Sequence, residues 1–286
     1  MHTIHTMHTT LITAPQLRAL LEGAAETVVL DASFDLADVQ AGERSHAQGH
    51  LPGARYVHLE RDLCAAKTGR NGRHPLPLRD VFSVTVGRLG ITPATQVVAY
   101  DQQGGMYAAR LWWMLRWLGH THVAVLDGGV AAWQAAGGAL HTTAPTLSAA
   151  PAYPAGTALA GSVDADQVMA RLGKLPLLDA RAAERFRGEV EPLDAQAGHI
   201  PGARNRFFKD NLDASGHFKA AEVLRAEFAA LLGRAQATEV VHQCGSGVTA
   251  CHNLLAMEVA GLAGSLLYPG SWSEWSADPA RPLAKG

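Results

Sequence analysis

Residues 198–204 read GHIPGAR and residues 49–55 read GHLPGAR, so one turn occurs twice, 149 residues apart (198 minus 49). Three further pairs of segments match in the same order: 29–32 with 177–180, 97–101 with 240–244, and 126–133 with 268–275. One such match could arise by chance, but four in register indicate a duplication. A period this long is typical of two whole domains rather than of a solenoid.

Each half of the chain alternates short apolar segments with segments of helical character. The expected strands are 27–30, 96–100 and 122–126 in the first half, and 175–178, 239–243 and 265–268 in the second. The expected helices are 16–21, 81–89 and 106–118, and then 164–172, 220–232 and 249–260. This alternation predicts an α/β protein with two tandem domains, each a mostly parallel sheet flanked by helices. We expect the domains at 1–141 and 162–286, joined by a linker over 142–161 that is rich in Pro, Ala and Thr.

The composition limits the classes of protein that fit. With 286 residues, 48% hydrophobic and 17% charged, the chain is long and apolar enough to fold as two packed domains. A formal net charge of −2 gives no reason to expect binding to nucleic acid, and the absence of an 18-residue apolar run argues against a membrane span. Three cysteines and a start without a secretory signal favour a reducing, cytoplasmic location. We expect a monomer.

The second half contains the strongest chemical signal. Residues 244–250 read CGSGVTA, between an apolar strand and a predicted helix. Two glycines let the main chain curl so that its N–H groups face inward, and the helix start adds further donors and a positive dipole end. Such a loop favours an anion at its centre, so the thiol of Cys244 should lose its proton readily. A lone cysteine is more often buried and inert, but this loop favours a nucleophile.

The two repeated turns, the endings at 126–133 and 268–275, and the loop at 244–249 together resemble the rhodanese family of tandem-domain sulfurtransferases. The resemblance covers nearly the whole chain. The loop is similar to that of the 3-mercaptopyruvate branch, whereas the thiosulfate branch typically carries Arg-Lys where this chain has Gly245-Ser246. The resemblance implies a catalytic C-terminal domain and a degenerate N-terminal copy, in which Asp101 stands at the place of Cys244.

The resemblance also implies roles for particular residues. Cys244 would carry the sulfur as a persulfide, and Ser246, His74 and Glu60, or Asp62 instead of Glu60, would form a proton relay. Arg185 would bind the donor's carboxylate through both of its oxygens. The other substrate-binding residues would be Gly245, Gly247, Val248, Thr249 and Tyr107. Thr249 could instead cap the following helix.

One departure from the family pattern concerns charge. Relatives often carry a second arginine before the second repeated turn, but residues 191–194 here read EPLD. Arg187 is a weaker candidate that could compensate. His50 and His199 recur without neighbouring metal ligands, so we expect each to tie a turn together by hydrogen bonds, and we expect no metal or cofactor.

We therefore expect an enzyme that moves sulfur from 3-mercaptopyruvate to cyanide or to a thiol, such as thioredoxin or a small thiol. A loop with two cations would favour dianionic thiosulfate, since each charge pair at about 4 Å is worth on the order of 4 kcal/mol at an effective dielectric near 20. This loop carries neither, so thiosulfate sulfurtransferase is the alternative, with a non-catalytic sulfur carrier as a third possibility. Phosphatase chemistry is excluded because Ala250 and Cys251 stand where a phosphate-binding arginine would be needed.

Overall fold

A computed structural model describes residues 7–143, 145 and 150–286. This part of the chain packs as two compact units, one built from the chain up to Leu63 and Pro77–Leu159, the other from Cys64–Leu76 and Ala160–Gly286. The predicted boundaries place residues 64–76 in the first domain, whereas this segment, called the 64–76 loop below, packs with the second unit. The domain boundaries stay a prediction. The described residues do not include 1–6, nor residues 144 and 146–149 of the expected linker.

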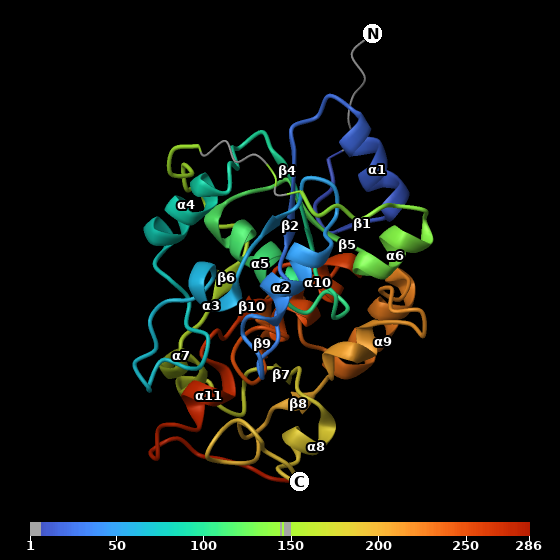
Figure 1. Cartoon of the computed structure of the whole chain (residues 1–286). Coiled ribbons are helices and arrows are strands. Elements are labelled where there is room, and N and C mark those ends of the chain that lie inside the picture. Colours follow the sequence, from blue (N-terminus) through green and yellow to red (C-terminus); the bar gives the residue numbers. More distant parts are fainter. Residues whose placement is uncertain (1–6, 144, 146–149) are drawn as a thin grey trace. The chain divides into compact units, whose positions relative to one another are not determined.

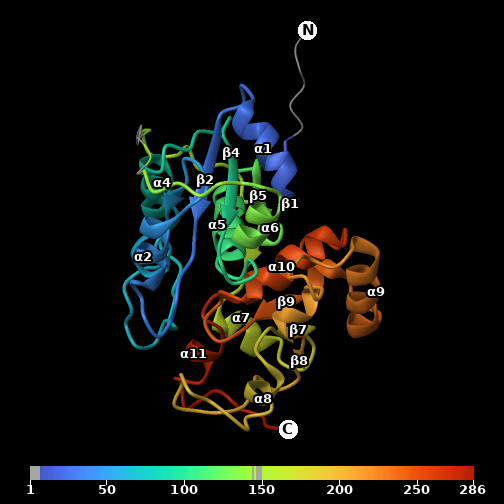
Figure 2. The ribbon, with the colours of Figure 1, turned by 45° about the vertical axis from the view of Figure 1, so that its right-hand side comes forward.

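The first unit is built on a parallel five-stranded sheet in the order β1-β5-β4-β2-β3 (Figure 1). Its strands are β1 (Leu11–Ile12), β2 (Thr27–Asp31), β3 (Arg55–Tyr56), β4 (Gln96–Tyr100) and β5 (Val123–Leu126). Its helices are α1 (Ala14–Glu22), α2 (Ala41–Gln48), α3 (Leu59–Asp62), α4 (Arg79–Arg88), α5 (Ala108–Leu118) and α6 (Gly129–Ala135). Helices α1 and α6 pack on one face of the sheet, and α5 packs against β4 and β5 with α4 beside it (Figure 2).

The sequence of β4 explains its central place. All five residues, QVVAY, are buried, which is typical of a parallel strand covered on both faces by helices. The start of α1 is fixed by a capping box between Thr13 and Gln16 and by a proline in the first turn. The apolar side of α1, including Leu17 and Leu20, then packs onto the sheet.

The second unit repeats this plan with its strands in the order β6-β10-β9-β7-β8, again all parallel. Its strands are β6 (Gly161–Ser162), β7 (Leu177–Asp179), β8 (Arg204–Asn205), β9 (Val241–Gln243) and β10 (Leu266–Leu267). Its helices are α7 (Ala165–Ala170), α8 (Ala183–Phe186), η1 (Phe208–Asn211), α9 (Ala221–Leu232), η2 (Ala237–Glu239), α10 (Ala250–Val259) and α11 (Ser271–Trp275). The two sheets correspond strand for strand, so the expected fold class is confirmed.

Helices cover the second sheet as they cover the first. Side chains from α7 and α11, among them Val168, Trp272 and Trp275, form one hydrophobic cluster with β7 and β9. Helices α10 and α9 pack together, and α10 contacts β9 and β10. The strand β9 begins at Val241 rather than at 239 because Ala237–Glu239 form a single 3-10 turn. Of the two-residue strands, β10 was predicted, at 265–268, whereas β1, β3, β6 and β8 were not, since they are too short to carry a periodic pattern.

The two repeated histidines play the same part in each unit. Nδ1 of His50 lies 2.8 Å from the carbonyl oxygen of His46, and Nδ1 of His199 lies 2.8 Å from that of Phe186. Each imidazole also stacks on the side chain of that same residue. The main chain of His199 pairs with Ala284, as that of His50 pairs with His141. The expectation that each histidine ties its turn together is confirmed.

Replacing His199 by alanine should lower the free energy of unfolding by about 1–3 kcal/mol, because the change removes a partly buried hydrogen bond and leaves the carbonyl of Phe186 without a partner. Urea unfolding monitored by circular dichroism measures this change. The control is Lys174→Ala at an exposed position, which should stay within about 0.5 kcal/mol of the wild type. Equal stability of the His199 variant and the wild type would contradict this role.

Candidate active site

Cys244 lies directly after β9, at the carboxyl end of a strand in the middle of the second sheet. Open parallel sheets bind ligands at this edge, because the loops that leave the strands converge there. The cysteine is almost fully buried, with 2% of its surface exposed. Its main-chain N–H donates to Oγ of Ser271 (3.1 Å), and its carbonyl accepts from Trp272 (2.9 Å). The start of α11 therefore holds the cysteine in place.

Two glycines give the cysteine loop its shape for different reasons. Gly247 has φ +74°, and a Cβ there would lie 2.4 Å from the carbonyl oxygen of Pro269, so both its dihedral angle and its neighbour require glycine. Gly245 has no such angle but lacks space, since a Cβ there would lie 3.0 Å from Nη2 of Arg73 and 3.6 Å from Nη1 of Arg185. The absence of a side chain at Gly245 therefore brings two guanidinium groups to the main chain beside the cysteine.

The first unit shows what this kind of loop binds. Asp101, at the position of Cys244, is buried, and its carboxylate lies within the turn that follows β4. Its two oxygens accept four main-chain hydrogen bonds, from the N–H groups of Gln103 (2.8 Å), Gly105 (2.8 Å), Tyr107 (2.8 Å) and Ala108 (2.9 Å). Burial raises the pKa of Asp101, and these donors oppose that rise. The loop of the first unit is thus an anion site filled by its own side chain.

The same loop in the second unit has no carboxylate. In the described chain, the N–H groups of Ser246, Val248 and Ala250 donate to no protein acceptor. These positions correspond to three of the donors that surround Asp101. Inward-facing main-chain donors at a helix start attract an anion, and the residue at the centre is Cys244. This part of the loop therefore has main-chain donors left to bind an acceptor.

Thr249 does not cap α10. The helix begins at Ala250, and the hydroxyl of Thr249 makes no capping hydrogen bond. The expectation of a cap is wrong because Thr249 has helical dihedral angles (φ −69°, ψ −17°), whereas a capping side chain needs an extended main chain to reach back to the helix. The N–H groups of Cys251 and His252 donate instead to the carbonyls of Val248 (3.0 Å) and Thr249 (3.1 Å).

The predicted serine and histidine lie together. Nδ1 of His74 is 2.7 Å from Oγ of Ser246, although 172 residues separate them, and both side chains are buried. The 64–76 loop delivers the histidine, and a hydrogen bond from the N–H of Ala65 to the carbonyl of Pro75 (2.9 Å) closes that loop at its base. A hydroxyl and an imidazole at this distance can exchange a proton.

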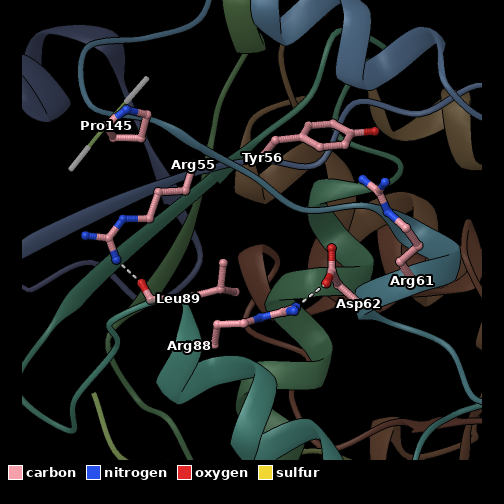
Figure 3. Close-up of a pocket in the computed structure, with 7 residues that line it drawn as sticks. All are labelled: Arg55, Tyr56, Arg61, Asp62, Arg88, Leu89 and Pro145. Atoms are coloured by element: carbon pink, nitrogen blue, oxygen red, sulfur yellow. Dashed lines mark hydrogen bonds and ion pairs between the residues drawn. The ribbon is translucent and has the colours of Figure 1, made fainter. Parts of the chain in front are cut away.

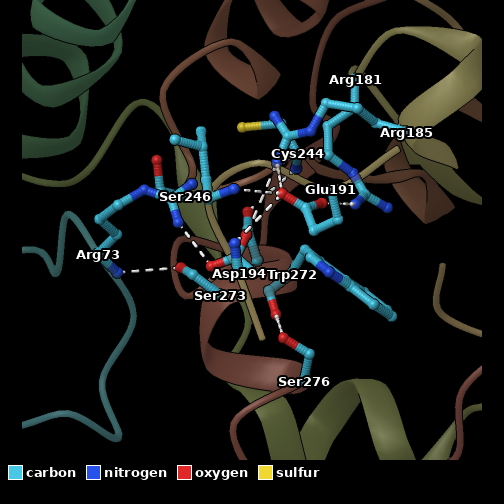
Figure 4. A network of polar contacts seen from close by, with 12 residues as sticks. Arg73, Arg181, Arg185, Glu191, Asp194, Cys244, Ser246, Trp272, Ser273 and Ser276 are labelled. Carbon is cyan, nitrogen blue, oxygen red and sulfur yellow. Dashed lines mark hydrogen bonds and ion pairs between the residues drawn. The ribbon is translucent and has the colours of Figure 1, made fainter. Parts of the chain in front are cut away.

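Arg185 is held beside the loop by acidic residues. Its Nη2 lies 2.7 Å from Oε1 of Glu191 and 3.7 Å from Oδ2 of Asp194 (Figure 4). Burial raises the pKa of Asp194, although the neighbouring arginines oppose this effect. Glu191 also accepts from Arg181, a buried arginine that binds Asp179 (2.7 Å). Together these contacts fix the guanidinium of Arg185 where it reaches Gly245.

Two arginines of this site were not found from the sequence. Burial opposes a charge on Arg181, but Asp179, Glu191 and a thiolate at Cys244 together raise its pKa. The sequence signal for Arg181 was its position just beyond the carboxyl end of a predicted strand. Arg73 was overlooked because nothing local shows where the 64–76 loop packs, yet it directly precedes His74 and reaches the cysteine loop with it. The loop sequence itself carries no cation, as expected, but Arg73 brings one to Gly245 from another part of the chain.

The choice of relay carboxylate concerns residues of the first unit. Asp62 binds Arg88 and accepts from the N–H of His58 (2.8 Å), so its oxygens are already engaged (Figure 3). A relay from either Glu60 or Asp62 to His74 stays a prediction, because both carboxylates belong to the first unit and His74 to the second. Asp62 also lines a pocket of about 570 Å³ with three arginines, of which Arg61 pairs with Glu43 (2.9 Å).

Two further candidates, Tyr107 and Arg187, have partners within their own units. Tyr107 is a buried residue of the first unit; its N–H binds Asp101, and its ring meets Phe34 edge-on at 5.6 Å, so its role in lining a cleft stays a prediction. Arg187 is 45% exposed and binds Glu189 (2.6 Å), not the cysteine loop. The described residues contain no cluster of three metal-ligating side chains, and none of their helices has the length and apolar character to cross a membrane.

A family model described as a rhodanese-like domain matches residues 13–136 and 164–278. The chain belongs to the rhodanese-like domain family. It is 48% identical over 282 residues to the "Probable 3-mercaptopyruvate sulfurtransferase" of Pseudomonas aeruginosa, an alignment that covers 96% of this chain and 98% of that protein. It is also 36% identical to human 3-mercaptopyruvate sulfurtransferase, with 86% and 84% covered, and 34% identical to chicken thiosulfate sulfurtransferase, with 86% and 85% covered.

Solved structures agree with this assignment. The 3-mercaptopyruvate sulfurtransferase of Leishmania major superimposes with a TM-score of 0.82 at 29% identity, covering 96% of this chain and 75% of that one. SseA from Escherichia coli, described with the rhodanese fold of 3-mercaptopyruvate sulfotransferases, gives 0.77 at 29% identity, with 93% and 99% covered. The expected family and reaction class are confirmed by these sulfurtransferase relatives, which include both donor branches.

Replacing Gly247 by alanine should disrupt this rhodanese-like loop. A left-handed alanine costs about 1–2 kcal/mol, and the contact with Pro269 adds a clash with rigid main chain. We expect iodoacetamide to alkylate Cys244 more slowly in this variant. The control is Gly173→Ala, which has the same φ of +74° but nothing within 4 Å of its Cβ, and should lose only the dihedral cost. If Cys244 were alkylated at the same rate in both variants, the contact between residue 247 and Pro269 would be unimportant.

Proposed function

We propose that this chain transfers sulfane sulfur from 3-mercaptopyruvate through a persulfide on Cys244 to a thiol or cyanide, and releases pyruvate. The observation that carries this proposal is that the N–H groups of Ser246, Val248 and Ala250 donate to no protein acceptor in the described chain, whereas the corresponding donors of the first unit bind the carboxylate of Asp101. The sulfurtransferases among the relatives support the reaction class.

In the first step, the Cys244 thiolate attacks the sulfur atom of the donor. An S–S bond forms, the C–S bond breaks, and its electron pair passes to carbon as the enolate of pyruvate. The enolate carbon takes up a proton, which the Ser246–His74 pair can supply, with Glu60 proposed as its carboxylate partner. The loop from Gly245 to Thr249 stabilises first the thiolate and then the persulfide anion through its N–H groups. Tyr107 is proposed to line the donor site.

In the second step, an acceptor thiolate or cyanide attacks the outer sulfur. The S–S bond breaks, Cys244 leaves as a thiolate, and the acceptor becomes a persulfide or thiocyanate. Neither step needs an external oxidant or reductant. In the first step the electron pair of the C–S bond stays with the carbon of pyruvate, and in the second step the sulfane sulfur keeps its oxidation level. We propose thioredoxin or a small thiol as the acceptor, and a cytoplasmic monomer as the working form.

The choice of donor depends on charge beside the loop. A 3-mercaptopyruvate molecule needs a cation for one carboxylate and donors for its ketone, which Arg185 and Ser246 can provide. Thiosulfate remains the second candidate, because Arg73 adds a guanidinium next to Gly245 and one relative is named a thiosulfate sulfurtransferase. We expect kcat/KM to be at least about tenfold higher with 3-mercaptopyruvate, a difference of about 1.4 kcal/mol. A clear preference for thiosulfate would reverse the choice.

Exposure to 3-mercaptopyruvate should add one sulfur atom to Cys244 and release pyruvate, and Cys244→Ser should abolish both while the protein stays folded. Intact-protein and peptide mass spectrometry locate the added sulfur, and lactate dehydrogenase measures the pyruvate. Cys64→Ser serves as the control and should behave as the wild type. Release of a single equivalent of pyruvate, with no further turnover after a thiol acceptor is added, would favour a sulfur carrier over an enzyme.

Arg185→Ala should raise the KM for 3-mercaptopyruvate by roughly 10- to 100-fold with a smaller effect on kcat, because a charge-assisted hydrogen bond to the donor is lost. Arg187→Ala is the matched control, since this arginine lies two residues away and binds Glu189 at the surface. Steady-state kinetics on both variants test the assignment. Unchanged KM in Arg185→Ala would remove Arg185 from the donor site.

A further inference from the structure

The guanidinium groups of Arg73 and Arg185 meet at Gly245, although 112 residues separate them in the sequence (185 minus 73). Each group has one outer nitrogen held by an acid: Nη1 of Arg73 binds Oδ1 of Asp194 (2.6 Å), and Nη2 of Arg185 binds Oε1 of Glu191 (2.7 Å). The other outer nitrogens, Nη2 of Arg73 and Nη1 of Arg185, are those nearest to the site of a Gly245 Cβ. Neither donates to a protein acceptor in the described chain.

The position of Arg73 is fixed at both its main chain and its side chain. Its N–H donates to Oγ of Ser273 (2.9 Å), and the N–H of Ser273 donates to the carbonyl of Gly245 (2.9 Å; Figure 4). The side chain is 20% exposed and is held by Asp194, which is 9% exposed. An arginine held at both ends loses little conformational entropy when a ligand binds, so it is prepared for recognition.

Two donors from separate guanidinium groups, directed at one place beside the nucleophile, suit a carboxylate. Each oxygen of the carboxylate can accept from one arginine, and both bonds are charge-assisted. Asp194 already illustrates the arrangement, since its oxygens approach Arg73 at 2.6 Å and Arg185 at 3.7 Å. This pair of guanidinium groups, called the fork below, has room because residue 245 is glycine.

We propose that Arg73 is a second donor-binding residue: Nη2 of Arg73 and Nη1 of Arg185 hold the two oxygens of the donor's carboxylate above Gly245. This rests on the proposed transfer from a 2-oxo acid donor. Glu191 and Asp194 act as positioning residues that turn the two guanidinium groups toward each other.

Kinetics of Arg73→Gln test this assignment. The KM for 3-mercaptopyruvate and the inhibition constant of pyruvate should both rise about tenfold or more, with kcat changed less than about threefold. Arg73→Lys should recover part of the affinity, because lysine keeps the positive charge but lacks the planar guanidinium group. Arg70→Gln removes an exposed arginine from the same 64–76 loop and should match the wild type.

A donor without a carboxylate separates binding from folding. Loading of Cys244 by inorganic polysulfide, followed by mass spectrometry, should slow much less in Arg73→Gln than loading by 3-mercaptopyruvate. In the Arg73→Gln/Arg185→Gln double variant, the loss in donor affinity should be less than the sum of the single losses, since both arginines hold one group. Unchanged KM in Arg73→Gln, or an equal loss with both donors, would overturn the proposal.

The proposed function and the proposed role of Arg73 can fail independently of each other. If the wild type loads from polysulfide but does not turn over 3-mercaptopyruvate, the proposed function fails, and calorimetric titration of the protein with pyruvate then tests the fork directly. Weaker pyruvate binding by Arg73→Gln than by Arg70→Gln would support the fork. Absence of pyruvate binding by the wild type, or equal binding by both variants, would overturn it.

Discussion

The main-chain N–H groups that follow a central strand in each unit require an anion. In the first unit this requirement is met internally, since the carboxylate of Asp101 accepts four of these hydrogen bonds. In the second unit the equivalent residue is Cys244, whose side chain is shorter and ends in sulfur. One difference in side chain thus distinguishes the two loops. In the first, the main-chain N–H groups are hydrogen-bonded to Asp101, and in the second the corresponding N–H groups of Ser246, Val248 and Ala250 have no protein acceptor in the described chain. The first unit is, in effect, an internal reference for the second.

Charge around the cysteine is organised by acids as much as by arginines. Three guanidinium groups surround the loop and are matched by three carboxylates: Arg73, Arg181 and Arg185, with Asp179, Glu191 and Asp194. Glu191 also accepts from the main-chain N–H groups of the segment that follows it, so it shapes that segment as well as orienting arginines. Arg181 lies over the ring of Trp272 at 4.8 Å, where its planar group is buried between apolar and acidic neighbours. The acids therefore aim the positive groups rather than merely cancel them.

Much of this arrangement could be predicted from the sequence because its signals are local. The repeated turns gave the duplication, the apolar runs gave the long strands, and the glycines beside Cys244 gave the loop. The pairing of Ser246 with His74 was predicted through the family resemblance, not from local pattern. The position of Arg73 depends on the path of the 64–76 loop, which no local pattern encodes. The failure of Thr249 to cap its helix depends on a main-chain dihedral angle that its residue type does not fix.

The 64–76 loop has a consequence for the dissection of such proteins. The chain leaves the first unit after Leu63, contributes His74 and Arg73 to the second, and returns to the first at Pro77. No single truncation can therefore yield the whole second unit. A fragment that starts at Ala160 contains Cys244 but lacks His74. The second unit therefore depends on a segment of the first half of the chain, even though that half carries Asp101 at the position of Cys244.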